Sequence, residues 1–283
     1  MAEIKFSEGR EGHYFDLLSK KVWQKAISQP QKQTLMEVGE ADVIPFIQKV
    51  LKQMHELERE AEKPLLERIG QEDAAISAIW CPSAPGTWSR PWKKDRYERI
   101  PYTKWWDRSQ VIASIKLSIA IGRLKAGFPV SGRLSRESQK EALDLSPPII
   151  YNGRPDENEA LRHAIGRGGY QAELLQQLVH LIDTDRGNKY NSLDQVRSFS
   201  LPNEQVMPGD RIGIVIRPGQ TVRLMHFFGN PANLFPQGVV VKLFTLGTGF
   251  EGLPHHHIQE ACGILYYRFT TGDAAEEPYP YEY

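Results

Sequence analysis

Cysteine is scarce in this chain of 283 residues, which contains only Cys81 and Cys262. The two lie far apart in the sequence and lack the spacing of metal ligands, so we expect no disulfide framework and no cysteine metal site. This usage fits a reducing compartment. Cys81 directly follows an apolar run, which favours a buried, inert thiol over a nucleophile.

An excess of charge of either sign is also lacking. Lys plus Arg and Asp plus Glu both number 35, so the formal net charge at pH 7 is zero with histidine neutral. Such a chain lacks the positive field that attracts nucleic acids and anionic membranes, and we expect neither as a partner. No segment approaches the ~18 to 20 uninterrupted apolar residues of a membrane span, and the first residues lack the order of a secretory signal. We therefore expect a cytoplasmic protein.

The loop that follows the first expected strand, residues 82–87, lacks three familiar motifs. It is not a GxxxxGKS/T phosphate loop, not a GxGxxG dinucleotide fingerprint and not a GxSxG nucleophile elbow. A ligand site in this loop must therefore be built from other groups than those of these motifs.

What the sequence does contain is an alternation of strand and helix patterns. Residues 1–72 read as helical, with Pro30 ending a first helix and a second stretch from about Asp42 to Ile69. The apolar run at 74–80 then suits a strand buried on both faces, as in a parallel sheet. Further strands are expected at 148–151, 211–216 and 237–244, with helices at 107–124, 157–165, 171–183 (running on into a short strand), 221–228 and 258–269, a polar turn at 191–195 and an extended tail.

This alternation predicts a Rossmann-like three-layer α/β fold with a mostly parallel sheet over residues 73–283, preceded by an N-terminal helical region over residues 1–72. In an open parallel sheet, ligands bind outside the carboxyl ends of the strands. Three polar loops, 82–87, 152–157 and 217–223, follow expected strands. We therefore expect them to converge on one polar pocket.

The first two loops offer different chemistry. Ser83 and Thr87 carry hydroxyls, and Gly86 lets the backbone approach a ligand closely, although the same residues also suit an ordinary turn. In the second loop, Arg154 can clamp a carboxylate or phosphate bidentately and Glu157 can hold a ribose hydroxyl or act as a general acid/base. The alternative is that this loop only caps a helix, with Arg154 solvated.

The third loop places two arginines around a turn, Arg217 and Arg223. We expect Arg223 in the first turn of a helix, where a cation gains nothing from the helix dipole. That position favours a role in binding a ligand or in an ion pair.

Taken together, four segments resemble the YdcF/SanA/ElyC-like family over roughly residues 74–246. They are WCPSAPG at 80–86 followed by Asp107-Arg108, Asn152-Gly153 followed by Glu157, NSLDQ at 191–195, and QTVR at 220–223. They are similar to the family's small-residue loop with an Arg-containing helix, its small-residue turn with a glutamate, its Asn-Thr-x-x-Asn element and its His-x-x-Arg turn. Gln220 replaces the family's histidine, so a proton-transfer role at that position does not carry over, because an amide does not titrate.

The resemblance implies a Rossmann-like fold and a nucleotide-like ligand, with S-adenosylmethionine as the candidate cofactor. The candidate ligand-binding residues are Ser83, Gly86, Thr87, Arg108, Asn152, Gly153, Arg154, Asn191, Gln220 and Arg223, the candidate catalytic residue is Glu157, and no metal ligand is expected. Two functions stay open: an enzyme acting on such a ligand, or a non-catalytic binding or sensing module to which the N-terminal helices respond.

Two other features attract competing interpretations. Aromatic and basic residues interleave between Trp88 and Trp106, which favours a lid or a partner interface over a surface for nucleic acid. The run His255-His256-His257 invites a metal site, but adjacent histidines on a helix point in different directions, and pairing of one of them with Glu260 is the simpler expectation. Self-association of the chain stays open.

Overall fold

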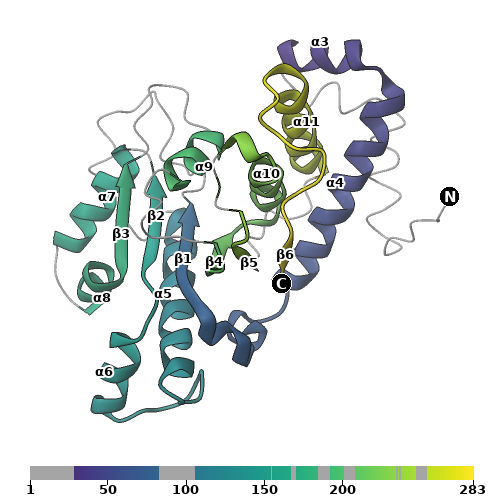
Figure 1. Cartoon of the computed structure of the whole chain (residues 1–283). Helices are drawn as coiled ribbons and strands as arrows, with labels where there is room; N and C mark the ends of the chain where they lie inside the picture. Colours follow the sequence, from purple (N-terminus) through teal and green to yellow (C-terminus); the bar gives the residue numbers. More distant parts are fainter. Residues whose placement is uncertain are drawn as a thin grey trace.

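The computed structural model describes residues 29–82, 106–153, 155–166, 170–183, 192–200, 208–233, 235, 237–246 and 254–283. Within these ranges the chain forms a Rossmann-like α/β fold of three layers, in which a parallel sheet lies between two sets of helices (Figure 1). The expected fold class is confirmed. No helix in the described ranges is both long enough and apolar enough to cross a bilayer.

The sheet contains six strands, β1 (Ile76–Pro82), β2 (Ile149–Gly153), β3 (Val179–Asp183), β4 (Arg211–Ile216), β5 (Val240–Thr245) and β6 (Tyr281–Glu282). Their order is β3-β2-β1-β4-β5-β6, and every neighbouring pair is parallel. The continuous apolar runs became strands because both faces of the sheet are covered, so their side chains are buried on either side.

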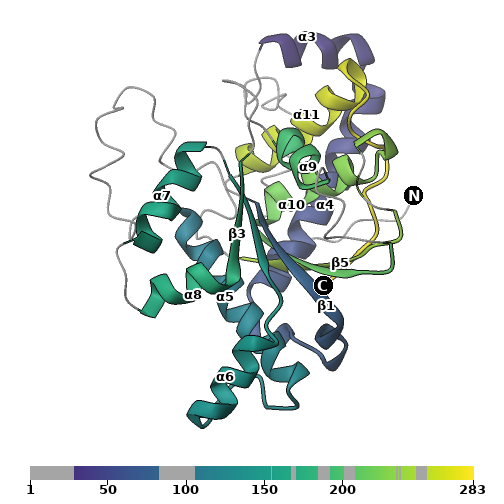
Figure 2. The ribbon, with the colours of Figure 1, turned by 60° about the vertical axis from the view of Figure 1, so that its left-hand side comes forward.

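The helices lie on the faces of the sheet where right-handed crossover connections place them. The helices α5 (Trp106–Lys125), α6 (Arg136–Asp144), α7 (Pro155–Gly166) and α8 (Tyr170–Leu178) connect β1 to β2 and β2 to β3 on one side. The helices α9 (Ser192–Ser200), α10 (Pro218–Phe228) and α11 (Pro254–Thr270) follow β3, β4 and β5 on the other side (Figure 2). Each face therefore has its own hydrophobic cluster.

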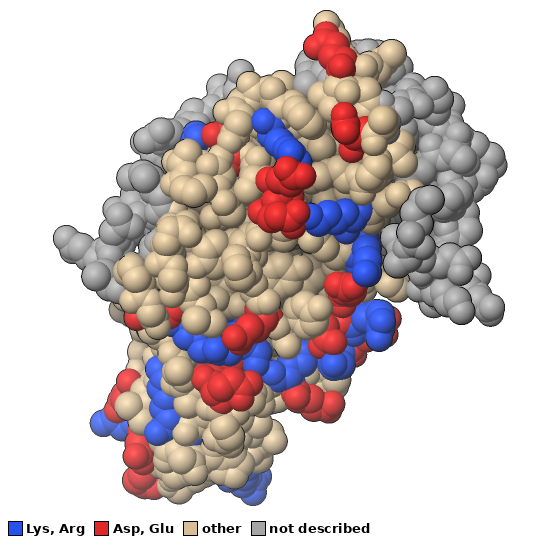
Figure 3. All heavy atoms as spheres, turned by 45° about the vertical axis from the view of Figure 1, so that its right-hand side comes forward, with Lys and Arg blue, Asp and Glu red and all other residues tan. Residues whose placement is uncertain are grey.

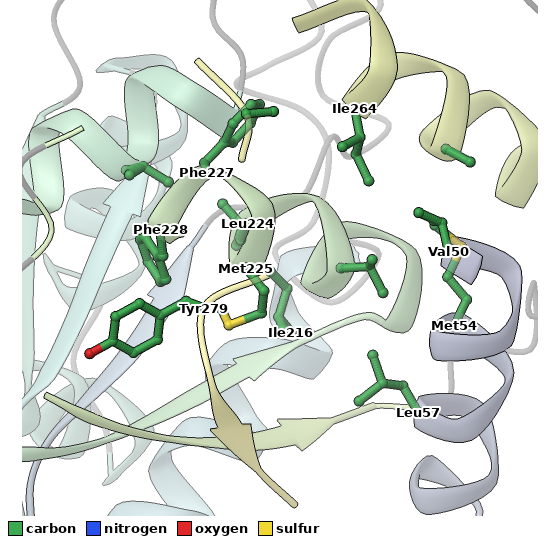
Figure 4. Packing of buried hydrophobic residues seen from close by; sticks show 14 of the residues in the cluster. Val50, Met54, Leu57, Ile216, Leu224, Met225, Phe227, Phe228, Ile264 and Tyr279 are labelled. Carbon is green, nitrogen blue, oxygen red and sulfur yellow. The ribbon is translucent and has the colours of Figure 1, made fainter. Parts of the chain in front are cut away.

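The N-terminal helices belong to the second of these faces. In α4 (Glu40–Ala61), Val43, Ile47, Val50, Met54 and Leu57 recur at helical spacing and are buried. Figure 4 shows the last three directed toward the side chains of α10 and α11. The helix packs against α10, α11 and β5. The helical stretch 29–61 thus shares a hydrophobic core with the sheet.

Several expected element boundaries are wrong. Pro30 lies in the first turn of α3 (Gln29–Val38), where a proline gives up only an amide that has no helical acceptor. The helix that Pro30 was expected to end lies outside the described residues. Gly39, at φ +95°, separates α3 from α4. The second helix ends at Ala61, and two 3₁₀ turns, η1 (Leu65–Arg68) and η2 (Gln71–Ala75), lead into β1.

Candidate functional site at the carboxyl edge of the sheet

The strand order reverses between β1 and β4. From β1 the chain continues to β2 on one side, and from β4 it continues to β5 on the other. The register pairs Pro82 with Asn152, Gly153 with Asp183, and Ile216 with Thr245, so the strands end along one line, which we call the carboxyl edge. In parallel sheets of this order, the point of reversal is where a ligand crevice opens.

Gln110 spans this point of reversal. It lies near the start of α5 with 1% of its surface exposed, and its Nε2 donates to Pro82 O at 3.3 Å and to Val215 O at 3.1 Å. Because both partners are carbonyls, the amide nitrogen must be the atom that faces them, and this fixes the orientation of the group. The side chain therefore joins the ends of β1 and β4.

The other half of the same carboxamide has spare hydrogen-bonding capacity. Gln110 Oε1 is buried and accepts no hydrogen bond within the described part of the chain. A buried carbonyl oxygen normally has a donor, because removing it from water without one costs about 1 to 3 kcal/mol. Gln110 thus presents an unused acceptor where the strand order reverses.

A second set of carboxamides links the end of β2 to α9 and α10. Asn152 Nδ2 donates to Gln195 O at 3.1 Å, and Gln195 Nε2 donates back to Asn152 O at 3.3 Å. Gln220 Nε2 donates to Gln195 Oε1 at 3.3 Å. All three side chains are buried. The structure therefore brings together two candidate residues, Asn152 and Gln220, through a third residue, Gln195, that was only part of a motif.

Two features of the local sequence produce this cluster. Residues 191–195 were expected to form a polar turn, but Ser192 begins α9, whose Leu193 and Val196 are buried at helical spacing and direct Gln195 inward. The helix α10 begins at Pro218, earlier than expected, because proline suits the first helical position. Gln220 consequently lies in the first turn of α10, beside the carboxyl edge.

Asn158 makes a similar link on the far side of β2. It lies in α7 and is buried, and its Nδ2 donates to Ile182 O of β3 at 2.9 Å. The described hydrogen bonds that join α5, α7 and α9 to the carboxyl ends of β1 to β4 thus come from carboxamides, which hold position without changing charge. Gln110 and Asn158 were missed from the sequence, since a polar residue in a helical pattern normally faces solvent.

Arg223 does not lie where the sequence indicated. It is in the second turn of α10, and its Nη1 is 2.8 Å from Glu260 Oε2 of α11. Of the two roles left open, the ion pair is the one that the structure contains. Of the three histidines expected to offer a partner to Glu260, the side chains of His255 and His256 lie outside the described part of the structure.

His257 instead pairs with Glu58. Its Nε2 lies 3.1 Å from Glu58 Oε1, and both side chains are buried between α11 and α4. Next to them, Thr245 Oγ1 donates to Leu57 O at 3.1 Å. This contact fastens α4 to the carboxyl end of β5. No group of three or more His, Cys, Asp or Glu side chains within the described ranges is arranged to hold a metal ion.

Five candidate residues, Ser83, Gly86, Thr87, Arg154 and Asn191, lie outside the described residues, as do residues 88–105. Arg108 is in α5 and Glu157 in α7, and the structure describes their backbone positions only. Gly153 is the last residue of β2, at the carboxyl edge. For these positions the roles assigned from the sequence stay predictions.

Both cysteines are buried thiols, and for Cys81 this burial was expected. Burial raises the pKa of Cys262 to about 12, so its thiol stays protonated at neutral pH.

Comparison with known proteins identifies no relative: no family model, no curated protein and no solved structure matches the chain. The resemblance to the YdcF/SanA/ElyC-like family therefore enters only the proposal that follows.

Proposed function

We propose that the chain binds a nucleotide-like small molecule at the carboxyl edge of its sheet, over the reversal between β1 and β4. The observation that carries this proposal is Gln110, which bridges the two strand ends through its Nε2, while its buried Oε1 has no donor among the described residues. A ligand N–H group, such as the exocyclic amine of an adenine, would supply that donor.

The surroundings favour an anionic or strongly polar partner. The helices α5, α7, α9 and α10 all begin on this side of the sheet, and their first amides and dipoles attract negative groups. Arg154 directly follows the end of β2, and we expect it to clamp a phosphate or carboxylate. S-adenosylmethionine and adenine nucleotides both combine an adenine amine with an anionic group, and both fit these features.

The role of Glu157, the third residue of α7, distinguishes an enzyme from a binding module. The carboxamides of Asn152, Gln195 and Gln220 hold a ligand without proton transfer, so they support a binding or sensing module. An enzyme would use Glu157 as its general acid/base. After a ligand is found, its conversion followed by mass spectrometry distinguishes the two. In an enzyme, Glu157→Gln stops turnover and keeps binding, whereas a binding module returns the ligand unchanged.

Thermal unfolding in the presence of S-adenosylmethionine, ATP and a sugar nucleotide tests the proposal. A ligand at about 100 times its dissociation constant adds about 2.7 kcal/mol to the free energy of unfolding and raises Tm. We expect at least one of these compounds to raise the Tm of the wild-type chain. Gln110→Met keeps the side-chain length and removes the carboxamide, so we expect it to abolish the shift.

Asn233→Leu is the matched control. Asn233 is also a buried carboxamide whose Nδ2 donates to two carbonyls, Phe227 O at 2.9 Å and Asp273 O at 2.8 Å, but it follows α10 on the opposite side of the sheet. Its loss should lower the unliganded Tm and leave the ligand-induced shift intact. The proposal fails if no compound raises the wild-type Tm, or if Gln110→Met retains the shift.

A further inference from the structure

A cavity lies far from the carboxyl edge, at the other end of α5. It has a volume of about 690 Å³ and lies between the last turns of α5, the segment that follows, α6 and Leu174 of α8. Figures 1 and 2 show α6 beside this end of α5, at the bottom of both views. The volume is that of a typical small-molecule site.

Four cationic side chains surround this cavity, which we call the cationic pocket: Arg123, Arg133, Arg136 and Lys140. No acidic residue contributes to its lining. Within the described ranges, none of the four forms an ion pair with a carboxylate. Like charges around one cavity repel one another and favour an anion inside it.

Arg123 is the most enclosed of these cations. Its Nη2 donates to Gly132 O at 2.9 Å, whereas its Nε is buried and donates to no acceptor in the described part of the chain. The guanidinium is thus anchored at one nitrogen and has an unused donor at another. A guanidinium held in this way suits a carboxylate, sulfonate or phosphate, whose oxygens accept several of its hydrogen bonds.

The charge pattern of α6 points to the same ligand class. Arg136 and Lys140 are four residues apart and face the pocket, and Glu137 and Glu141 are four residues apart on the next face of the helix. Like charges at this spacing repel one another, although Lys140 also lies three residues from Glu137 and four residues from Asp144. The two cations of α6 thus lie together on the face that lines the pocket, where an anion would reduce their mutual repulsion.

Apart from Gln139, the remaining side chains of the lining are apolar. Ile119, Leu134, Leu143 and Leu174 contribute aliphatic surface beside the cations. The walls are held in place because α6 packs directly on the backbone of α5: a Cβ on Gly122 would lie 2.1 Å from Ala142 O. The pocket is therefore positioned by the packing of two helices.

We propose that the cationic pocket binds an organic anion, a molecule with a carboxylate, sulfonate or phosphate group on an apolar body. The acidic group lies among Arg123, Arg136 and Lys140, and the apolar body covers Ile119, Leu143 and Leu174. This site is independent of the one proposed at the carboxyl edge, since the two lie at opposite ends of α5.

Titration with 8-anilinonaphthalene-1-sulfonate tests the proposal, because this probe combines a sulfonate with an aromatic body and fluoresces in apolar surroundings. We expect saturable binding of one probe per chain. The double variant Arg136→Gln/Lys140→Gln should weaken binding about tenfold or more, because two charge-assisted contacts are lost. It removes a like-charge pair on α6 and leaves the buried core untouched, so it should fold at least as well as the wild type.

The control Lys52→Gln/Arg59→Gln removes two exposed cations from α4, outside the pocket, and should bind the probe as the wild type does. The uncharged analogue N-phenyl-1-naphthylamine should bind about tenfold more weakly than the sulfonate. The proposal is overturned if the folded chain binds no sulfonate probe saturably, if the two double variants behave alike, or if the uncharged analogue binds as tightly.

Discussion

The two edges of the parallel sheet are built from different chemistry. At the amino edge, Asp73 is fully buried just before β1, and its carboxylate meets Lys242 Nζ of β5 at 2.6 Å and Arg211 Nη2 of β4 at 3.7 Å. At the carboxyl edge, the buried side chains between the strand ends and the helices are the carboxamides of Gln110, Asn152, Gln195 and Gln220. The amino edge is thus joined by opposite charges, whereas the strand ends around the reversal between β1 and β4 are joined by neutral hydrogen bonds.

The difference favours the carboxyl edge as the place for the proposed ligand. A buried charge must be paired, and the Asp73 carboxylate already has its partners within the fold. It also accepts a hydrogen bond from the amide of Gly70 at 2.9 Å. A carboxamide tolerates an unused donor or acceptor at smaller cost, as Gln110 does. In Figure 3, side chains of both signs lie next to one another in a band across the lower half of the molecule, below a broad uncharged area. The amino edge is thus a structural element, and the carboxyl edge retains capacity for a ligand.

The largest effect is expected from breaking the ion pair at the amino edge. Asp73→Asn leaves Lys242, only 4% exposed, without its counter-charge and should lower the free energy of unfolding by about 3 to 5 kcal/mol. Urea denaturation measures this loss. The control is Glu72→Gln, because Glu72 lies 3.4 Å from the same lysine with 60% of its side chain exposed and should cost at most about 1 kcal/mol. If both variants lower the free energy of unfolding equally, the buried ion pair of Asp73 and Lys242 does not have the expected stabilising effect.

Acid should weaken the fold through His226 of α10. Burial lowers the pKa of His226 to about 4 from 6.5, and the neutral ring donates from Nδ1 to Ala275 O at 2.9 Å. The unfolded chain therefore binds a proton that the folded chain does not, and the free energy of unfolding falls as the pH drops from 6.5 to 4, by about 3 kcal/mol. Above pH 6.5 this group contributes no slope.

Urea denaturation at pH 7.5, 5.5 and 4.5 checks this pH dependence. His226→Gln should have a flatter profile than the wild type, whereas His180→Gln, which alters an exposed histidine in β3, should retain the wild-type slope. An unchanged slope in His226→Gln would show that other groups cause the acid sensitivity.

The smallest effect is expected at Arg223. Its ion pair with Glu260 is about one quarter exposed at each end, so Arg223→Gln should cost only about 0.5 to 1 kcal/mol of unfolding free energy. Because the guanidinium is engaged between α10 and α11, this variant should also retain the ligand-induced rise in Tm, unlike Arg154→Ala. If Arg223→Gln abolishes the ligand-induced rise in Tm, Arg223 contacts the ligand, and the ligand site is not formed by carboxamides alone.

The sequence predicted the strands well because short continuous apolar runs such as 74–80 and 148–151 are typical of strands that are buried on both faces of a parallel sheet. It could not place the reversal between β1 and β4, since alternation of strands and helices is the same for several strand orders. It also missed Gln110, whose partners Pro82 O and Val215 O come from strands 28 and 105 residues away. Only the folded chain brings these groups together.

The error at residues 191–195 has a local cause. Asn, Ser and Asp are frequent in turns and also at the starts of helices, and the polar run concealed the spacing of Leu193 and Val196 that marks the buried face of α9. The spacing of these two residues could have predicted a helix with Gln195 on its buried side.

Amide hydrogen exchange with and without S-adenosylmethionine, ATP or a sugar nucleotide tests most directly whether the carboxyl edge is the ligand site. We predict that a compound that raises Tm slows exchange in the first turns of α5, α7, α9 and α10, and leaves residues 70–75 of the amino edge unchanged. Slower exchange confined to residues 70–75, or to α6 and the cationic pocket, would contradict the account.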